Sequence, residues 1–138
     1  MRKQWVTAVV MVALALVIAP GFAAMVPEAD AADAKAKCRV GTNPARVQIG
    51  VDADGLAKGF AQFQVTSGGN TSSVLSDKVD PFGDAAAEWD SAIDRGDPAE
   101  GSRGSIDANF VGVGGTVHAT VSQHNAVVAT VTATCVRK

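Results

Sequence analysis

The chain has 138 residues, of which 47% are hydrophobic and 19% charged, and its formal net charge is −2. This length leaves room for one domain. The near balance of 14 acidic and 12 basic residues argues against a nucleic-acid-binding protein, which normally shows a strongly basic face, and no polybasic run is present to hold a membrane surface.

The first 31 residues have the features of a secretory signal peptide. Arg2 and Lys3 precede an uncharged run, 4–27, and Pro20-Gly21 interrupts that run. The small-residue motif 29–31 (Ala-Asp-Ala) then fits a cleavage site. An uncleaved membrane anchor is the alternative, because the run is nearly long enough to span a bilayer. The Pro-Gly break and the cleavage motif favour removal of residues 1–31, so we expect a secreted or cell-envelope protein that leaves the membrane after cleavage.

Two cysteines remain after cleavage, Cys38 near the new N-terminus and Cys135 three residues before the end. An isolated pair in an exported protein indicates a disulfide, because the compartment is oxidising. The spacing excludes a Cys-x-x-Cys redox pair, and the number of ligands excludes a zinc site. We therefore predict a short Ala/Lys/Asp linker over residues 32–37, followed by one disulfide-bonded domain over residues 38–138.

Most of the domain shows the two-residue period of β-strands. The clearest early runs are 45–53, with Val47, Ile49, Val51 and Ala53 facing inward, and 60–66, with Ala61, Phe63 and Val65 facing inward. Further strands are predicted at 72–75, 86–89 and 105–113, and the glycine-rich segment 101–105 is predicted to be a turn.

The C-terminal stretch 116–135 has the pattern of a β-hairpin. Alternating valine and alanine positions lie on either side of a polar turn, 123–125. In the second strand Val127, Ala129, Val131 and Ala133 share the inward register with Cys135. The cysteine is thus predicted to point into the core and to tie the last strand to the first.

Six or seven short strands without an amphipathic helix predict an all-β fold, a two-sheet antiparallel immunoglobulin-like sandwich with one disulfide. The segment DGLAKGFAQFQVTSGG, 54–69, resembles the Gly-Leu-x-x-Gly, aromatic, alternating-strand segment of bacterial immunoglobulin-like and fibronectin-III-like modules. It departs from them at Lys58 and Phe63, where proline and tyrosine are usual. The resemblance implies a sandwich with an adhesive or accessory role.

The acidic segment 77–100 is the one compositional outlier. Calcium takes six to eight oxygen ligands, so five aspartates are candidate calcium ligands: Asp77, Asp80, Asp84, Asp90 and Asp94. The spacing does not match an EF-hand loop, and a solvated loop whose acids cap turns is the preferred interpretation. Phe82, Asp84 and Trp89 are candidate contacts for a protein partner, although Trp89 is favoured as a core residue because such sandwiches commonly bury one large ring.

No catalytic residue is assigned, because the sequence has neither a Gly-x-Ser-x-Gly nucleophile motif nor a His-x-x-x-His pair. The leading hypothesis is a non-enzymatic secreted or cell-envelope β-sandwich, without a cofactor, that acts through contacts with a protein partner or with copies of itself. The alternatives are a calcium-dependent binding module using residues 77–100 and a small secreted hydrolase with an unrecognised site.

Overall fold

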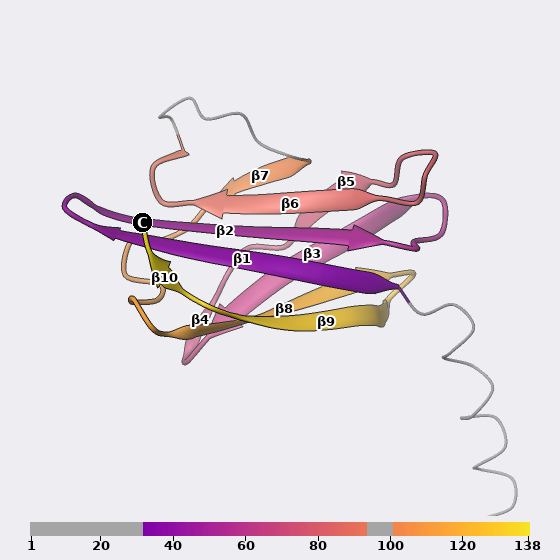
Figure 1. Ribbon diagram of the computed structural model, residues 1–138. Coiled ribbons are helices and arrows are strands. Elements are labelled where there is room, and N and C mark those ends of the chain that lie inside the picture. The colour runs from indigo at the N-terminus through magenta and orange to yellow at the C-terminus, as the bar shows by residue number, and fades with distance from the viewer. Residues whose placement is uncertain (1–31, 94–100) are drawn as a thin grey trace, which may run out of the picture. The chain divides into compact units, whose positions relative to one another are not determined.

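The structure of the protein is a computed structural model that describes residues 32–93 and 101–138. The expected signal peptide, residues 1–31, and the candidate ligand Asp94 lie outside these residues. The described chain consists of strands in two facing sheets (Figure 1). No helix able to cross a membrane occurs in the part of the chain that the structure describes.

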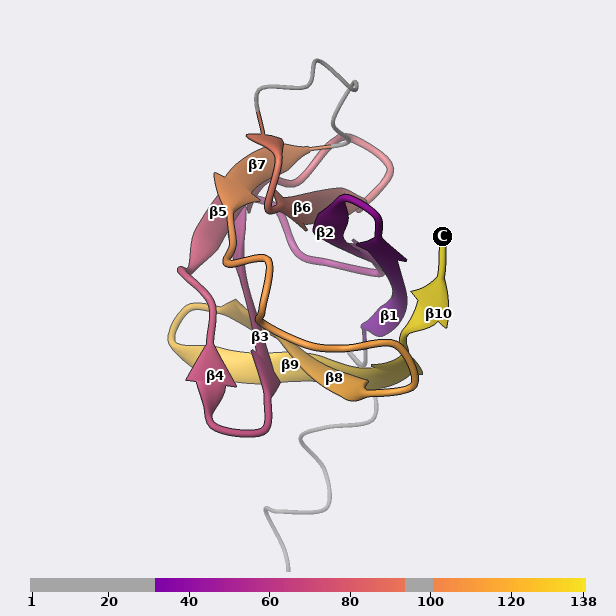
Figure 2. The same cartoon turned by 90° about the vertical axis from the view of Figure 1, so that its left-hand side faces the viewer.

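The first sheet has the strand order β10–β1–β2–β6–β7. Its strands are β1 (Asp33–Thr42), β2 (Ala45–Asp54), β6 (Ala85–Asp90), β7 (Ser102–Ser105) and β10 (Val136–Arg137). The second sheet has the order β4–β3–β8–β9, and β5 also pairs with β3. Its strands are β3 (Phe60–Ser67), β4 (Asn70–Thr71), β5 (Leu75–Lys78), β8 (Thr116–Gln123) and β9 (Ala126–Thr134). Figure 2 shows β1, β2, β6 and β7 in one layer and β4, β8 and β9 in the other.

The connectivity is that of an immunoglobulin-like sandwich. Strands β1, β2 and β6 are neighbours in one sheet, and they correspond to strands A, B and E of an immunoglobulin domain. Strands β3, β8 and β9 are neighbours in the other sheet and correspond to strands C, F and G. The predicted two-sheet sandwich with one disulfide is confirmed. The strands outnumber the six or seven predicted, because short edge strands border both sheets. Two pairs, β1–β10 and β6–β7, are parallel rather than antiparallel.

The core lies between the sheets and follows the two-residue period. Every inward position predicted in β2 and β3 is buried, and Trp89 of β6 has no exposed surface. The indole Nε1 of Trp89 donates a hydrogen bond to the Ser73 carbonyl oxygen at 3.1 Å, which satisfies the only polar atom of the ring. Trp89 is therefore a core residue, and its candidacy as a partner contact is wrong.

Four segment predictions were wrong. Residues 33–37, expected as a linker, are the first half of β1. Residues 102–105, expected in a turn, form β7. Residues 106–113, expected in a strand, form turns, because the Asp107 carboxylate and carbonyl accept hydrogen bonds from the amides of Asn109 and Phe110. Finally, no strand spans residues 72–75, because β4 ends at Thr71 and β5 begins at Leu75.

The inward register of β9 is confirmed for Ala129, Val131 and Ala133, which pack against the core. Val127 is 60% exposed instead. A register shift lies between Val121 and Ser122 of β8, so Val121 pairs with Ala129 and Ser122 with Val127. The bulge places one extra residue, Val128, against the core and turns Val127 outward.

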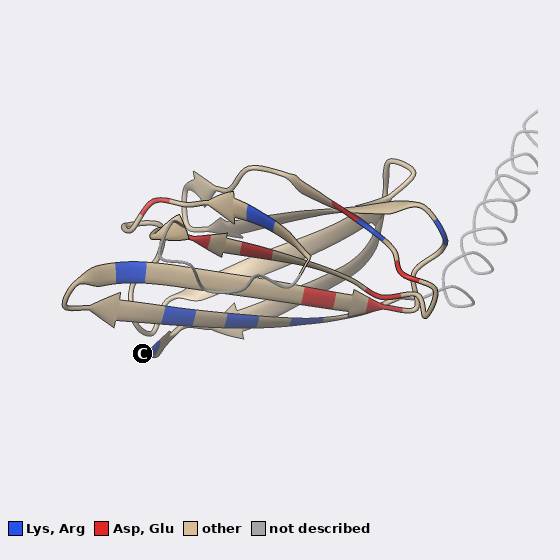
Figure 3. Cartoon of the chain, turned by 90° about the horizontal axis from the view of Figure 1, so that it is seen from above, with Lys and Arg blue, Asp and Glu red and all other residues tan. Residues whose placement is uncertain are grey.

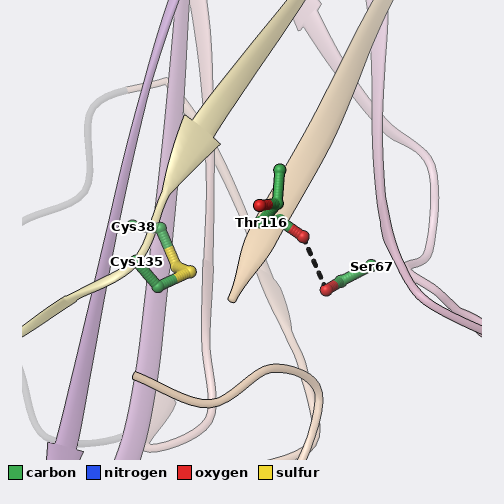
Figure 4. Close-up of a disulfide and its surroundings, with 4 residues drawn as sticks. All are labelled: Cys38, Ser67, Thr116 and Cys135. Carbon is green, nitrogen blue, oxygen red and sulfur yellow. Dashed lines mark hydrogen bonds between the residues drawn. A yellow bond between two sulfur atoms is a disulfide. The ribbon is translucent and has the colours of Figure 1, made fainter. Parts of the chain in front are cut away.

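The Cys38–Cys135 disulfide is confirmed, with an S–S distance of 1.99 Å (Figure 4). Cys38 belongs to β1, and Cys135 lies between β9 in one sheet and β10 in the other. The bond therefore fixes the point where the chain crosses between sheets. Nearby, the Ser67 hydroxyl donates to the Thr116 carbonyl oxygen at 2.7 Å, which ties the end of β3 to the start of β8.

Candidate functional site

The turn between β5 and β6 presents an exposed phenylalanine. One carboxylate oxygen of Asp80 accepts hydrogen bonds from the amides of Phe82 at 2.8 Å and Asp84 at 2.9 Å. The Gly83 amide donates to the Asp80 carbonyl, and the Gly83 carbonyl accepts from the Leu56 amide, both at 3.0 Å. This is an Asx-type turn, in which a short acidic side chain replaces backbone partners. Phe82 is 86% exposed on a backbone held in one conformation.

The backbone conformation favours glycine at position 83 of this turn. Its φ is +86°, in the left-handed region that other residues rarely adopt. An added Cβ would be in ordinary van der Waals contact with the Leu56 carbonyl oxygen, at 3.4 Å. The turn and the chain at Leu56 are thus in close contact, which helps to fix the direction in which Phe82 projects.

An open, acidic hollow of about 480 Å³ lies beside this turn. Its charged lining comprises six aspartates and two lysines, for a formal charge of −4: Asp33, Asp52, Asp54, Asp77, Asp80, Asp84, Lys35 and Lys78. The lining combines the start of β1, the end of β2 and the β5–β6 turn, and Figure 3 shows acidic segments gathered at this end of the first sheet. This end of the sandwich can attract a basic ligand.

Asp77, like Asp80, is an acid of the hollow with a structural role. An Asp77 carboxylate oxygen accepts a hydrogen bond from the Ala86 amide at 2.9 Å and so joins β5 to β6. Gly101 lies against both residues, because a Cβ there would approach the Ala86 oxygen to 2.0 Å. Among residues 32–93 and 101–138, no group of three or more His, Cys, Asp or Glu side chains is placed to hold a metal ion.

The candidate calcium ligands do not share one place. Asp77, Asp80 and Asp84 line the hollow. Asp90 is fully buried on β6 and is bound by arginine: Arg46 Nε donates to one carboxylate oxygen at 3.0 Å and Nη2 to the other at 2.7 Å. Arg103 Nη2 adds a contact at 3.3 Å. The assignment of Asp90 to a calcium site is wrong, because cationic groups already surround its carboxylate.

The environment of Asp90 lowers the pKa of its carboxyl group. Burial by itself would raise the pKa of Asp90, but hydrogen bonds from Arg46 and the Ala92 amide, the charge of Arg46 and a hydrogen bond from Gln48 outweigh burial. Together they lower the pKa from its ordinary value of 3.8 to about 2.

This low pKa predicts acid-sensitive stability. A depressed pKa in the folded state stabilises the protein above the unfolded pKa, and the contribution is lost as the pH falls through the folded pKa. We expect the ionised carboxylate to contribute about 2 kcal/mol that disappears between about pH 5 and about pH 2. Urea unfolding of the wild type and of Asp90→Asn across this range measures it. Equal pH dependence in the two proteins would contradict the assignment.

Comparisons with known proteins do not identify the chain. No protein family model matches it, and no curated protein is similar in sequence. Among solved structures, the chain is similar to the CARDB domain of the PF1109 protein from Pyrococcus furiosus in complex with di-metal ions. The sequence identity is 18% and the TM-score 0.39, with 77% of this chain and 86% of that chain covered.

Sequence reasoning found part of the acidic hollow and missed the rest. It singled out Asp77, Asp80 and Asp84, which line the hollow, and Phe82, which lies on the β5–β6 turn beside it. It did not include Asp33, Asp52 or Asp54, which come from β1 and β2. The antiparallel pairing of Asp33 with Asp54 was the missing information, since it brings two distant acids to one end.

Proposed function

We propose that this protein is a secreted or cell-envelope binding domain, without catalytic activity, that holds a protein partner at the acidic end of its sandwich. The observation that carries the proposal is Phe82, a large apolar ring exposed at the tip of a hydrogen-bonded turn. Aromatic side chains are prominent among the residues that dominate binding energy at protein interfaces. A pre-organised turn loses little conformational entropy when a partner binds.

The surrounding charge indicates the kind of partner. With six aspartates and two lysines beside the turn, complementary binding favours a partner with a basic patch around an apolar pocket. The disulfide supports an oxidising compartment outside the cytosol. Because the attraction is electrostatic, the association rate should fall as ionic strength rises.

The proposal is tested by capture of partners from the culture supernatant or cell surface on the immobilised protein. The variant Phe82→Ala with Asp84→Ala removes the apolar anchor and one acidic side chain, while the Asp80 carboxylate still accepts the backbone amides of the turn. We expect capture to weaken by at least about tenfold, the effect of losing roughly 1.4 kcal/mol at a dominant contact.

The matched control is Val136→Ala, which shortens an apolar side chain that is 55% exposed on β10 and does not line the hollow. It should leave capture unchanged, and the melting temperature of both variants should stay near that of the wild type. Capture that survives in the double variant, or that is lost equally with Val136→Ala, would overturn the proposed site.

A further inference from the structure

The first sheet has opposite charges at its two ends. β1 and β2 pair along their whole length, so Asp33 lies opposite Asp54 at one end and the turn at 43–44 closes the other. The ten residues of β1 separate these ends by about 30 Å. The acidic hollow lies at the Asp33 end. Beyond it, residues 34–51 contain no Asp or Glu and four basic side chains: Lys35, Lys37, Arg39 and Arg46.

The C-terminal strand adds further cations at the end with the turn. β10 pairs with the second half of β1. Arg137 Nη1 donates a hydrogen bond to Thr42 Oγ1 at 3.0 Å, and Lys138 Nζ donates one to Gln48 Oε1. Arg39, Arg137 and Lys138 are exposed, and residues 108–138 contain no Asp or Glu. Figure 3 shows basic segments toward the C-terminus, at the end of the sheet away from the acidic segments.

A second hollow, of about 330 Å³, lies at this basic end. We call it the basic hollow, and its lining residues are Gly41, Thr42, Asn43, Pro44, Arg46 and Lys138. Gly41 has no side chain and Pro44 offers an apolar ring, while Arg46 and Lys138 bring positive charge. The volume is at the lower end of the range of ligand pockets, about 300–1,000 Å³, so the hollow can take one aromatic ring. A ring beside Arg or Lys gains a cation–π attraction.

We propose that copies of this chain associate head to tail, with the Phe82 turn of one copy in the basic hollow of the next. The inference rests on the proposed function and names its partner. That partner needs basic charge around a space for the Phe82 ring, and the opposite end of the same chain has both. The aspartates beside the turn then face Arg39, Arg137 and Lys138, which is the complementary pairing of charges that favours association.

Head-to-tail contact has a consequence for the size of the assembly. Two different surfaces meet, so every added copy leaves a Phe82 turn free at one end and a basic hollow free at the other. A contact of this kind builds a ring or an open chain of copies rather than a closed pair. Because the contact combines opposite charges, it should weaken as ionic strength rises.

The test is light scattering after size exclusion over a concentration series, with the expressed full chain purified in its oxidised form. The wild type should exceed the mass of a dimer as its concentration rises. The turn variant is Phe82→Ala with Asp84→Ala, and the tail variant is Arg137→Glu with Lys138→Glu. Each should raise the dissociation constant for self-association at least about tenfold, because each lacks one of the two surfaces.

Mixing the two variants is the decisive measurement. The turn variant keeps its basic hollow and the tail variant keeps its Phe82 turn, so an equimolar mixture should form a one-to-one dimer and nothing larger. This dimer would also show that both variants are folded. The matched control is Thr130→Glu, an exposed position on β9 that lines neither hollow, and it should assemble as the wild type does.

A wild type that stays monomeric, or a mixture that does not form the dimer, would overturn the head-to-tail contact. The proposed function fails separately. If the purified wild type is monomeric but still captures another protein through Phe82, the partner is not a second copy and the proposed binding site stands. If neither capture nor self-association depends on Phe82, both proposals are overturned.

Discussion

Replacing Asp90 with alanine is expected to lower the free energy of unfolding by about 3 kcal/mol, the low end of the usual cost of breaking a buried ion pair. Arg46 and Arg103 are 16% and 18% exposed at their side chains and both contact this one carboxylate. Removing it takes from Arg46 the carboxylate that accepts two of its hydrogen bonds, while Arg103 keeps its contact with Glu88 at 3.6 Å. The low end applies because both arginines still reach some solvent.

Chemical denaturation of Asp90→Ala and Asp90→Asn would measure this effect, since the asparagine keeps the shape and one acceptor but removes the charge. Asp52→Ala is a matched control, because Asp52 is an exposed aspartate on the neighbouring strand β2. Surface substitutions of this kind usually change stability by no more than about 0.5 kcal/mol. An unchanged unfolding midpoint in Asp90→Ala would show that the buried cluster contributes nothing to stability.

Loss of the disulfide is expected to lower the free energy of unfolding by about 2–5 kcal/mol in Cys135→Ala. The bond joins residues 97 positions apart, and in the chain-entropy model a loop of that length accounts for about 4–5 kcal/mol. Thermal or urea unfolding of the variant against the oxidised wild type measures the change.

Two comparisons distinguish the effect of losing the disulfide bond from the effect of replacing a cysteine side chain. The double variant Cys38→Ala with Cys135→Ala should be close to the single variant, because both remove the same bond and the effects are not additive. The wild type treated with a reductant should approach the same stability. A Cys135→Ala protein as stable as the oxidised wild type would contradict the prediction.

The strands with strongly apolar alternation could be predicted from the sequence, and the weakly apolar ones could not. β2, β3 and β8 alternate valine, isoleucine and phenylalanine with polar residues, so their buried faces were evident. β1 alternates too, but its inward residues at 34 and 36 are alanines, which have low strand preference and gave the segment the composition of a linker. Hydrogen bonding along the whole length of β2 stabilises β1 as a strand, although its own residues have a low strand preference.

Local hydrogen bonding overrode periodicity after β7. Ile106, Ala108 and Phe110 alternate as a strand would, yet Asp107 captures the amides of Asn109 and Phe110 and turns the chain. Phe110 is buried all the same. A two-residue period predicts which side chains face the core, but it does not exclude a turn that places the same side chain there.

The candidate site was only partly predictable because its acids come from distant segments. Phe82 could be found from its position between proline and glycine in a polar segment. Asp90 was grouped with the loop acids because it is near them in the sequence. It is the last residue of β6, and its carboxylate accepts a hydrogen bond from Arg46. Only the pairing of β2 with β6, which sets Gln48 opposite Asp90, shows that this acid belongs to the sheet.

The position of the disulfide also determines how the domain would carry mechanical load. β1 begins at one end of the sandwich and the C-terminus lies toward the other (Figure 1). Tension applied between residue 32 and Lys138 passes through the covalent bond between Cys38 and Cys135, so the chain between the two cysteines cannot be pulled out. Only residues 32–37 and 136–138 lie outside the bridge, and those in β1 and β10 are already extended at roughly 3.3 Å per residue, so pulling adds little length. While oxidised, the domain is a nearly inextensible link.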